Sequence, residues 1–166
     1  MKSCMIIILL ISLSHLWACS GWVENRAAMQ QYAPENADIS PDLVKANISA
    51  TDYSSVVHIM RGKVQGNSLQ RSMGGYVNHI YEARVMETLK GQSYENITFS
   101  VMAESDIDPI LPDYPVIVSL CGRGPDAMYV PDNGYELPAT QTLTTAARDF
   151  ARKRNTIVPS KSICPE

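Results

Sequence analysis

Alternating apolar and polar positions predict β-strands across the middle of the chain, between residues 54 and 130. In the clearest segment, Ile97, Phe99 and Val101 alternate with polar residues, which is the two-residue period of a strand with one buried face. The segment from Val77 to Val85 shows the same alternation. Glycine and polar residues between the two segments suit a hairpin connection, so we expect the two strands to pair.

Three more segments complete a predicted set of five strands. They lie at residues 54–65, 116–121 and 128–130, and the connections hold most of the glycines and prolines of this region. Gly62 interrupts the first of these strands, and a glycine within a strand often marks a bulge or a bend at the corner of a barrel. The pattern therefore predicts a mainly β fold, a small five-stranded barrel.

A helical period replaces the alternation near the C-terminus. Between residues 140 and 153, apolar residues such as Leu143 and Ala147 recur on one face, which predicts an amphipathic helix packed on the barrel. Basic residues gather at its end and complement the negative pole of the helix dipole, so we interpret them as structural. Ser40 and Pro41 are typical of a helix start, and we expect one or two turns there.

Residues 1–18 have the pattern of an export signal. Lys2 precedes an apolar run, Met5–Leu13, that is too short to span a bilayer as a helix. The next residues, Leu16-Trp17-Ala18-Cys19, resemble the lipobox of bacterial lipoproteins, in which the cysteine receives lipid and becomes the mature N-terminus. Trp17 departs from that pattern, because the position is usually small. Ordinary signal cleavage at this point, which would release a soluble exported protein, is the alternative.

A lipidated Cys19 would anchor the protein to a membrane. Several acyl chains, palmitate among them, hold a protein more stably than the marginal attachment of one chain. Ser20 resembles the outer-membrane-directed version of the motif, so the expected location is the bacterial outer membrane, with a soluble periplasmic or secreted protein as the alternative. Residues 19–39 show no sustained apolar period and are interpreted as a flexible tether, which leaves residues 40–166 as the barrel domain.

The number of cysteines predicts a disulfide bond. Cys4 leaves with the signal and Cys19 is lipidated or removed, so Cys121 and Cys164 remain as one pair. In an oxidising compartment such a pair most often forms a disulfide, and two free buried thiols are the alternative.

The charge of the exported chain argues against a nucleic-acid partner. The 14 lysines and arginines include Lys2, so 13 remain against 17 acidic residues and the formal charge is −4. Binding to phosphate backbones relies on an excess of basic residues, which this chain lacks.

The succession of strand segments is similar to the OB-like barrel of the tissue-inhibitor-of-metalloproteinase and netrin-module group, including its small bacterial exported relatives. The segments that carry the resemblance are Val57–Val64, Tyr81–Val85 with Leu89-Lys90-Gly91, Ile97–Phe99 and Tyr114–Val118. The resemblance implies an OB-like barrel over residues 54 to 150. In the inhibitors, the N-terminal cysteine binds the target's zinc through its free amine. A lipidated Cys19 would carry lipid on that amine, so this route of inhibition is not implied.

Candidate metal ligands are few, and we expect no metal or other cofactor. His58 and His79 lie on neighbouring predicted strands with Glu82 nearby, and they bind zinc only if they meet across the strand pair. Two half-buried histidines satisfied by hydrogen bonds are the more common arrangement. An acidic group has oxygen ligands of the kind that calcium prefers but lacks the pattern of an EF-hand loop: Glu104, Asp106, Asp108 and Asp113.

Binding is favoured over catalysis. No nucleophile elbow, phosphate loop or dinucleotide fingerprint is present, so we expect no catalytic residue. Five tyrosines near loops and strand ends suit a ligand on a barrel face, or equally the filling of a small barrel: Tyr76, Tyr81, Tyr114, Tyr129 and Tyr135. We expect a non-enzymatic lipoprotein that binds a protein or glycan with loops 66–75 and 104–114. An exported hydrolase or metal-binding enzyme that uses the acidic loop or the histidines is the alternative, and a purely structural lipoprotein is a third possibility.

Overall fold

The computed structural model describes residues 38–66, 75–104, 107–153 and 162–165, which fold as a mainly β structure with two helices. The signal peptide, Cys19, nearly all of the expected tether and most of the loop 66–75 lie outside the described residues. The elements are α2 (Pro41–Ala50), β1 (Tyr53–Gln65), β2 (Tyr76–Lys90), β3 (Asn96–Glu104), β4 (Val116–Leu120), β5 (Met128–Tyr129), β6 (Glu136–Pro138) and α4 (Gln141–Lys153).

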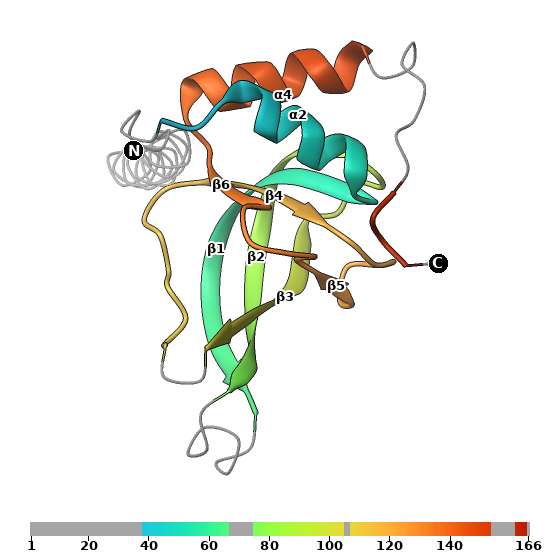
Figure 1. Ribbon diagram of the computed structural model, residues 1–166. Helices are drawn as coiled ribbons and strands as arrows, with labels where there is room; N and C mark the ends of the chain where they lie inside the picture. The colour runs from blue at the N-terminus through green and yellow to red at the C-terminus, as the bar shows by residue number, and fades with distance from the viewer. Residues whose placement is uncertain (1–37, 67–74, 105–106, 154–161, 166) are drawn as a thin grey trace, which may run out of the picture. The chain divides into compact units, whose positions relative to one another are not determined.

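The strands form one curled, mixed sheet in the order β5-β3-β2-β1-β4-β6 (Figure 1). Neighbouring strands are antiparallel except β3 and β5, which are parallel. The backbones of Cys121, just after β4, and Tyr129 in β5 exchange two hydrogen bonds of 2.9 Å, so β4 and β5 meet although they lie apart in the sheet order. On this side the sheet curls back on itself.

The prediction of a mainly β fold with a C-terminal helix is confirmed, but the expectation of five strands is wrong within the described residues. The sixth strand, β6, extends the sheet beside β4, with Leu137 opposite Ile117. It has three residues, and two-residue alternation cannot be recognised over so short a segment.

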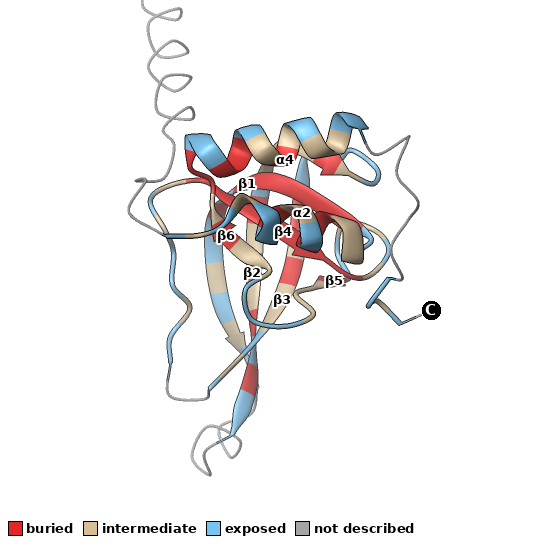
Figure 2. Ribbon diagram, turned by 45° about the horizontal axis from the view of Figure 1, so that its top comes forward, coloured by how far each residue is buried: buried red, intermediate tan, exposed pale blue. Residues whose placement is uncertain are grey.

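Two apolar cores lie on the two faces of the sheet. The inner core fills the curl and includes Val57, Phe99 and Leu120. The outer core lies between the sheet and the two helices, and Ile48 and Ile117 belong to it. Because both faces of β4 are covered, all five of its residues are buried, as are the first five of β1 (Figure 2).

Helix α2 is longer than the one or two turns expected from the sequence. It begins as predicted, with Ser40 Oγ accepting a hydrogen bond from the backbone N–H of Asp42 at 3.3 Å. It continues for 10 residues because Val44 and Ile48 are buried in the outer core. At its end, the Lys90 ammonium donates to the carbonyl oxygens of the last turn, which satisfies acceptors that the helix itself leaves free.

Helix α4 lies beside α2 and shows the predicted amphipathic face, with Leu143 and Ala147 buried. Thr140 caps its start by accepting a hydrogen bond from the backbone N–H of Leu143 at 3.1 Å. Arg148, from the basic cluster, forms a two-pronged ion pair with Glu87 of β2, in which Nε and Nη2 lie 2.8 and 2.7 Å from Oε2. This contact agrees with the structural interpretation of that arginine.

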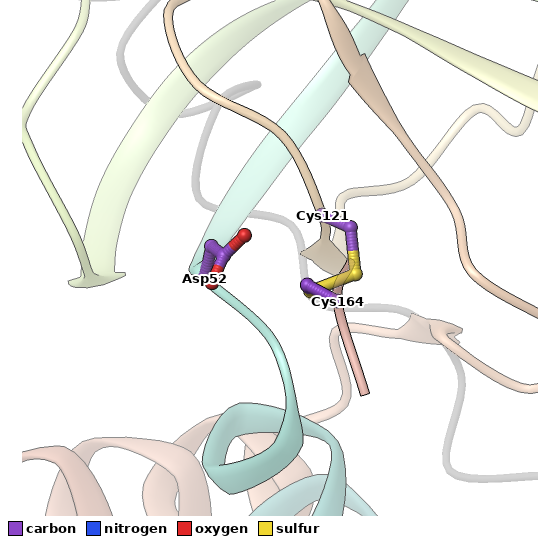
Figure 3. A group of neighbouring side chains, drawn as sticks. All are labelled: Asp52, Cys121 and Cys164. Carbon is purple, nitrogen blue, oxygen red and sulfur yellow. A yellow bond between two sulfur atoms is a disulfide. The ribbon is translucent and has the colours of Figure 1, made fainter. Parts of the chain in front are cut away.

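The C-terminal segment is attached beside the start of β1. Cys121 and Cys164 lie at disulfide distance with Cα atoms 5.3 Å apart, as the cysteine count predicts (Figure 3). The backbone N–H of Ile163 also donates to the carbonyl of Ala50, the last residue of α2, at 3.0 Å. The bond therefore joins the strand β4 to the chain end next to α2.

Candidate binding cleft

A cleft opens where β3 runs beyond its short partner β5. Strand β5 pairs with β3 only at Phe99 and Ser100, so β3 continues from Val101 to Glu104 with β2 as its one strand neighbour among the described residues. The cleft at this place has a volume of about 580 Å³ and is bounded by β2, β3, β6 and the segment 107–114. It is the end of the curled sheet that β5 leaves open.

Gly62 of β1 lets the segment 107–112 approach this opening. A Cβ atom at Gly62 would lie 2.7 Å from Cβ of Pro109, closer than such atoms pack, and 3.1 Å from Cε1 of Tyr81, which is a tight contact. A bulge precedes it, because the register between β1 and β2 shifts between Ile59 and Arg61. Of the two alternatives that Gly62 suggested, a bulge or a bend, the structure shows a bulge just before it, and the glycine also makes room for one wall of the cleft.

Two polar groups of β2 lie at the inner wall of the cleft. The His79 side chain is 3 % exposed, and its Nε2 atom has no hydrogen-bond partner among the described residues. The Tyr81 ring stacks on Phe99 of the inner core with centroids 5.5 Å apart. A buried nitrogen without a partner loses hydration that nothing replaces, so His79 retains an unused capacity to bind a ligand.

Glu136 of β6 adds a carboxyl group to the cleft. Burial raises the pKa of Glu136 from its ordinary value of 4.5 to about 7. Burial, and then the charge of Glu136, raise the pKa of the Tyr81 phenol, while a hydrogen bond from the backbone of Ile110 acts in the opposite direction. Near neutral pH the cleft therefore holds a carboxyl group that exists in both protonation states.

Large exposed apolar side chains surround these polar groups. Tyr76, Met102, Ile107 and Ile110 line the cleft and are 66 %, 65 %, 43 % and 72 % exposed. They are four of the eight large apolar residues that are exposed among the described residues. Exposed apolar patches of this kind mark interaction sites on protein surfaces.

The structure separates the two histidines that the sequence suggested as a metal pair. His58 is exposed and pairs with Arg84, whereas His79 is buried and pairs with Val64 near the other end of the same strand pair. Glu82 lies on the face of β2 opposite to His79, since the buried residues of β2 alternate with it. The suggestion that these residues meet across the strands is wrong.

The acidic group contributes two residues to the cleft. Glu104 and Asp108 line it, Asp113 does not, and Asp106 lies outside the described residues. Among the described residues, one group of three potential metal ligands comes close together, formed by Asp52, Cys121 and Cys164 (Figure 3). Its two sulfur atoms are bonded to each other, which leaves the carboxylate as the one available ligand atom.

The tyrosines divide between the cleft and other surroundings. Tyr76, Tyr81 and Tyr114 line the cleft, while Tyr129 lines a separate hollow beside β5. Sequence reasoning missed Glu136, which has the largest pKa shift from burial among the described groups, and the aliphatic residues that line the cleft with it. A glutamate between Tyr135 and Leu137 indicates a partly buried carboxyl group only if the segment is known to be a strand, and β6 was not recognised in the sequence.

No family model matches the chain, and no curated protein is significantly similar to it. Over the described residues, neither helix has the length and apolar character needed to cross a membrane. The cleft is therefore interpreted from its own residues.

Proposed function

We propose that this protein is a non-enzymatic binding module of the bacterial cell envelope, and that a protein partner occupies the cleft. The observation that carries the proposal is the gathering of exposed apolar side chains around buried polar groups at one opening. Burying four such side chains against a partner supplies the apolar contact that holds complexes together, and His79 and Glu136 supply specificity.

The unpaired edge of β3 favours a protein over a glycan. The Ser100 carbonyl accepts a hydrogen bond from the backbone N–H of Val130 at 2.8 Å. The backbone N–H and C=O groups of the even-numbered residues of β3 therefore point away from β2. Met102 is the next such residue, and its backbone has no partner among the described residues. An extended peptide can pair with an exposed strand edge while its side chains enter neighbouring pockets. The aliphatic rim gives a sugar few hydrogen bonds.

We also propose that the sheet is an OB-like barrel, of the kind found in the metalloproteinase-inhibitor and netrin group. The order of the first five strands supports this assignment. In the sheet, β3, β2, β1 and β4 are successive neighbours, and β5 pairs with β3. The contact between Cys121 and Tyr129 then brings β5 to β4, so the five strands follow one another around a closed ring. The OB-fold is a five-stranded, partly open barrel that binds ligands on its strands and loops. Strand β6 is then an addition beside β4.

Attachment of lipid at Cys19 remains part of the proposal, with the outer membrane as the location. Its support is the lipobox-like sequence that ends at Cys19. Growing cells with a radioactive fatty acid tests it. Label is expected in the wild-type protein and absent from Cys19→Ala, and absence of label from both would remove the anchor.

Site-specific photocrosslinking in intact cells tests the cleft itself. A photoreactive amino acid replaces Met102 in the cleft or, as the control, Leu43 on α2, which is also exposed. A discrete crosslinked protein is expected from position 102 and not from position 43. The same set of adducts at both positions, or none at position 102, would refute a partner in the cleft.

One observation favours the second candidate, an exported hydrolase. A carboxyl group with a pKa near 7 in a cleft is suited to general acid–base catalysis. Screening purified protein against ester, peptide and glycoside substrates distinguishes the two. Turnover that disappears in Glu136→Gln would establish the enzyme instead of the binding module.

A further inference from the structure

The polar groups of the cleft are all acidic or uncharged at high pH. Glu104, Asp108 and Glu136 are its carboxylates, and no lysine or arginine is among its described lining residues. His79 adds a buried ring nitrogen that no described residue satisfies. The aromatic rings of Tyr76, Tyr81 and Tyr114 also line the cleft, and no described lining residue supplies a lysine or arginine cation.

We propose that the partner inserts a lysine or arginine side chain into the cleft, where its cation lies against the Glu136 carboxylate and the neighbouring apolar residues of the partner cover the rim. This inference rests on the proposed function and specifies the chemistry of the partner.

Charge complementarity carries the argument. The half-buried Glu136 carboxylate has no counter-ion among the described lining residues, which is unfavourable, and a cation brought by the ligand reduces that penalty. An anionic group would instead meet three carboxylates at the same opening. The faces of tyrosine rings also attract cations, so the aromatic residues act in the same direction as the carboxylates.

His79 adds directionality to the site. With the proton on Nδ1, the buried Nε2 atom accepts a hydrogen bond from an ammonium or guanidinium group. Arginine and lysine both have several N–H donors, so one group can reach the imidazole and the carboxylate together. The imidazole then gains the partner that it lacks in the free protein.

The exposed apolar side chains around the opening indicate that the partner has apolar residues next to its lysine or arginine. Met102, Ile107 and Ile110 are exposed around the opening and need apolar partners in a complex. The long aliphatic stem of lysine or arginine itself packs well on such side chains. The preferred ligand is therefore a basic residue within an apolar segment.

Binding should strengthen as the pH rises. The titratable groups that line the cleft with Glu136 are Tyr76, His79 and Tyr81 of β2, Glu104 of β3, and Asp108 and Tyr114 of the connecting segment. A cation needs the ionised form of Glu136, whose pKa is about 7 in the free protein. Because the competent fraction sets the apparent affinity, affinity is expected to rise about tenfold from pH 6 to pH 8.

Peptide titrations of the full-length protein test the inference. The probes are acetylated, amidated heptapeptides with Lys, Arg, Gln or Glu at the centre between leucines, measured by fluorescence anisotropy at pH 6 and pH 8. At pH 8 the Lys and Arg peptides are expected to bind at least tenfold more tightly than the Gln peptide, with a smaller difference at pH 6. Glu136→Gln, which keeps the shape of the side chain, should abolish the preference. Glu82→Gln, on the opposite face of β2, should preserve it.

Equal binding of the Lys and Gln peptides, no binding of any peptide, or a preference that survives in Glu136→Gln would overturn the inference. The crosslink at position 102 separates this failure from failure of the proposed function. If the crosslink forms but peptides are not distinguished by charge, the cleft binds a partner of different chemistry. If the crosslink is absent, the proposed function falls and the inference with it.

Discussion

The two ends of the curled sheet differ in what covers them. At the end next to the helices, β4 is buried on both faces, and the disulfide and the ion pair of Arg148 join elements that are distant in sequence. At the opposite end, β3 extends beyond β5, and its Met102 side chain is 65 % exposed. We therefore expect the covered end to contribute more to stability, and the uncovered end leaves apolar and polar side chains accessible.

Buried polar side chains occur at both ends of the sheet. At the covered end, some buried polar groups are paired, since Ser54 and Ser119 share a hydrogen bond of 2.9 Å and Thr51 donates to the Asn47 carbonyl at 2.8 Å. The buried hydroxyl groups of Ser55 and Thr144 at that end have no described partner. At the cleft, His79 Nε2 has no described partner, and burial shifts the pKa of Glu136. The cleft is therefore distinguished by an unsatisfied nitrogen that lines the same opening as a carboxyl group with a raised pKa.

Phe99→Ala should produce the largest loss of stability. Phe99 is 1 % exposed at the centre of the inner core, and truncating a buried phenylalanine typically destabilises by about 3–5 kcal/mol. Urea unfolding followed by circular dichroism measures the change. A loss below about 1 kcal/mol would mean that the inner core is not closely packed.

Removal of the disulfide should have an effect of similar size. The bond closes a loop over a sequence separation of 43 residues, and the chain-entropy estimate for such a loop is about 4 kcal/mol. The double variant Cys121→Ser with Cys164→Ser avoids a free thiol, and its thermal unfolding is compared with the wild type. Reduction of the wild type by dithiothreitol should reproduce the shift, and unchanged midpoints in both would contradict a stabilising bond.

Glu136 should make the wild type less stable at high pH. Its pKa is about 7 in the folded protein against an ordinary value of 4.5. The native state therefore binds more protons between these values, and stability falls as pH rises from 4.5 to 7, by up to about 3 kcal/mol at 1.36 kcal/mol for each pKa unit. Glu136→Gln should remove this decline and be more stable than the wild type at pH 8. Parallel pH–stability curves for the two proteins would be inconsistent with a carboxyl group buried in the cleft.

The ion pair between Arg148 and Glu87 should contribute less to the free energy of unfolding than the preceding features. The two side chains are 36 % and 35 % exposed, and such pairs contribute at most about 1 kcal/mol. A double-mutant cycle with Arg148→Ala and Glu87→Ala measures the coupling, which should fall in 1 M salt. Coupling that is insensitive to salt would show that packing of α4, and not charge, holds the contact.

Met102→Ala should change stability least, by under about 0.5 kcal/mol, because the side chain is already exposed. Its effect is expected on partner capture instead, since it removes apolar surface from the cleft. The comparison with Phe99→Ala contrasts a buried and an exposed side chain of the same strand. A strongly destabilised Met102→Ala that still captures its partner would reverse that division.

The local patterns of the sequence predicted most of the regular structure. The inward residues of β3 and the buried face of α4 lie where the two-residue and helical periods indicate, since Ile97 and Phe99, like Leu143 and Ala147, are buried. The alternation in β1 changes sides after the bulge at Met60, so that Val57 and Ile59 and then Gly62 and Val64 share a face. A bulge moves every later side chain to the other face, and spacing alone does not locate it.

By itself, then, the sequence determined the elements that depend on a repeating period and the pairing that depends on a count of cysteines. The tertiary structure decided the rest: it separated His58 from His79, lengthened α2 by packing it on α4, and placed Glu136 against Tyr81. The physical reason is that periods record which face of one element is buried. Strand register, the covering of an edge and the burial of a charge depend on contacts between residues far apart along the chain.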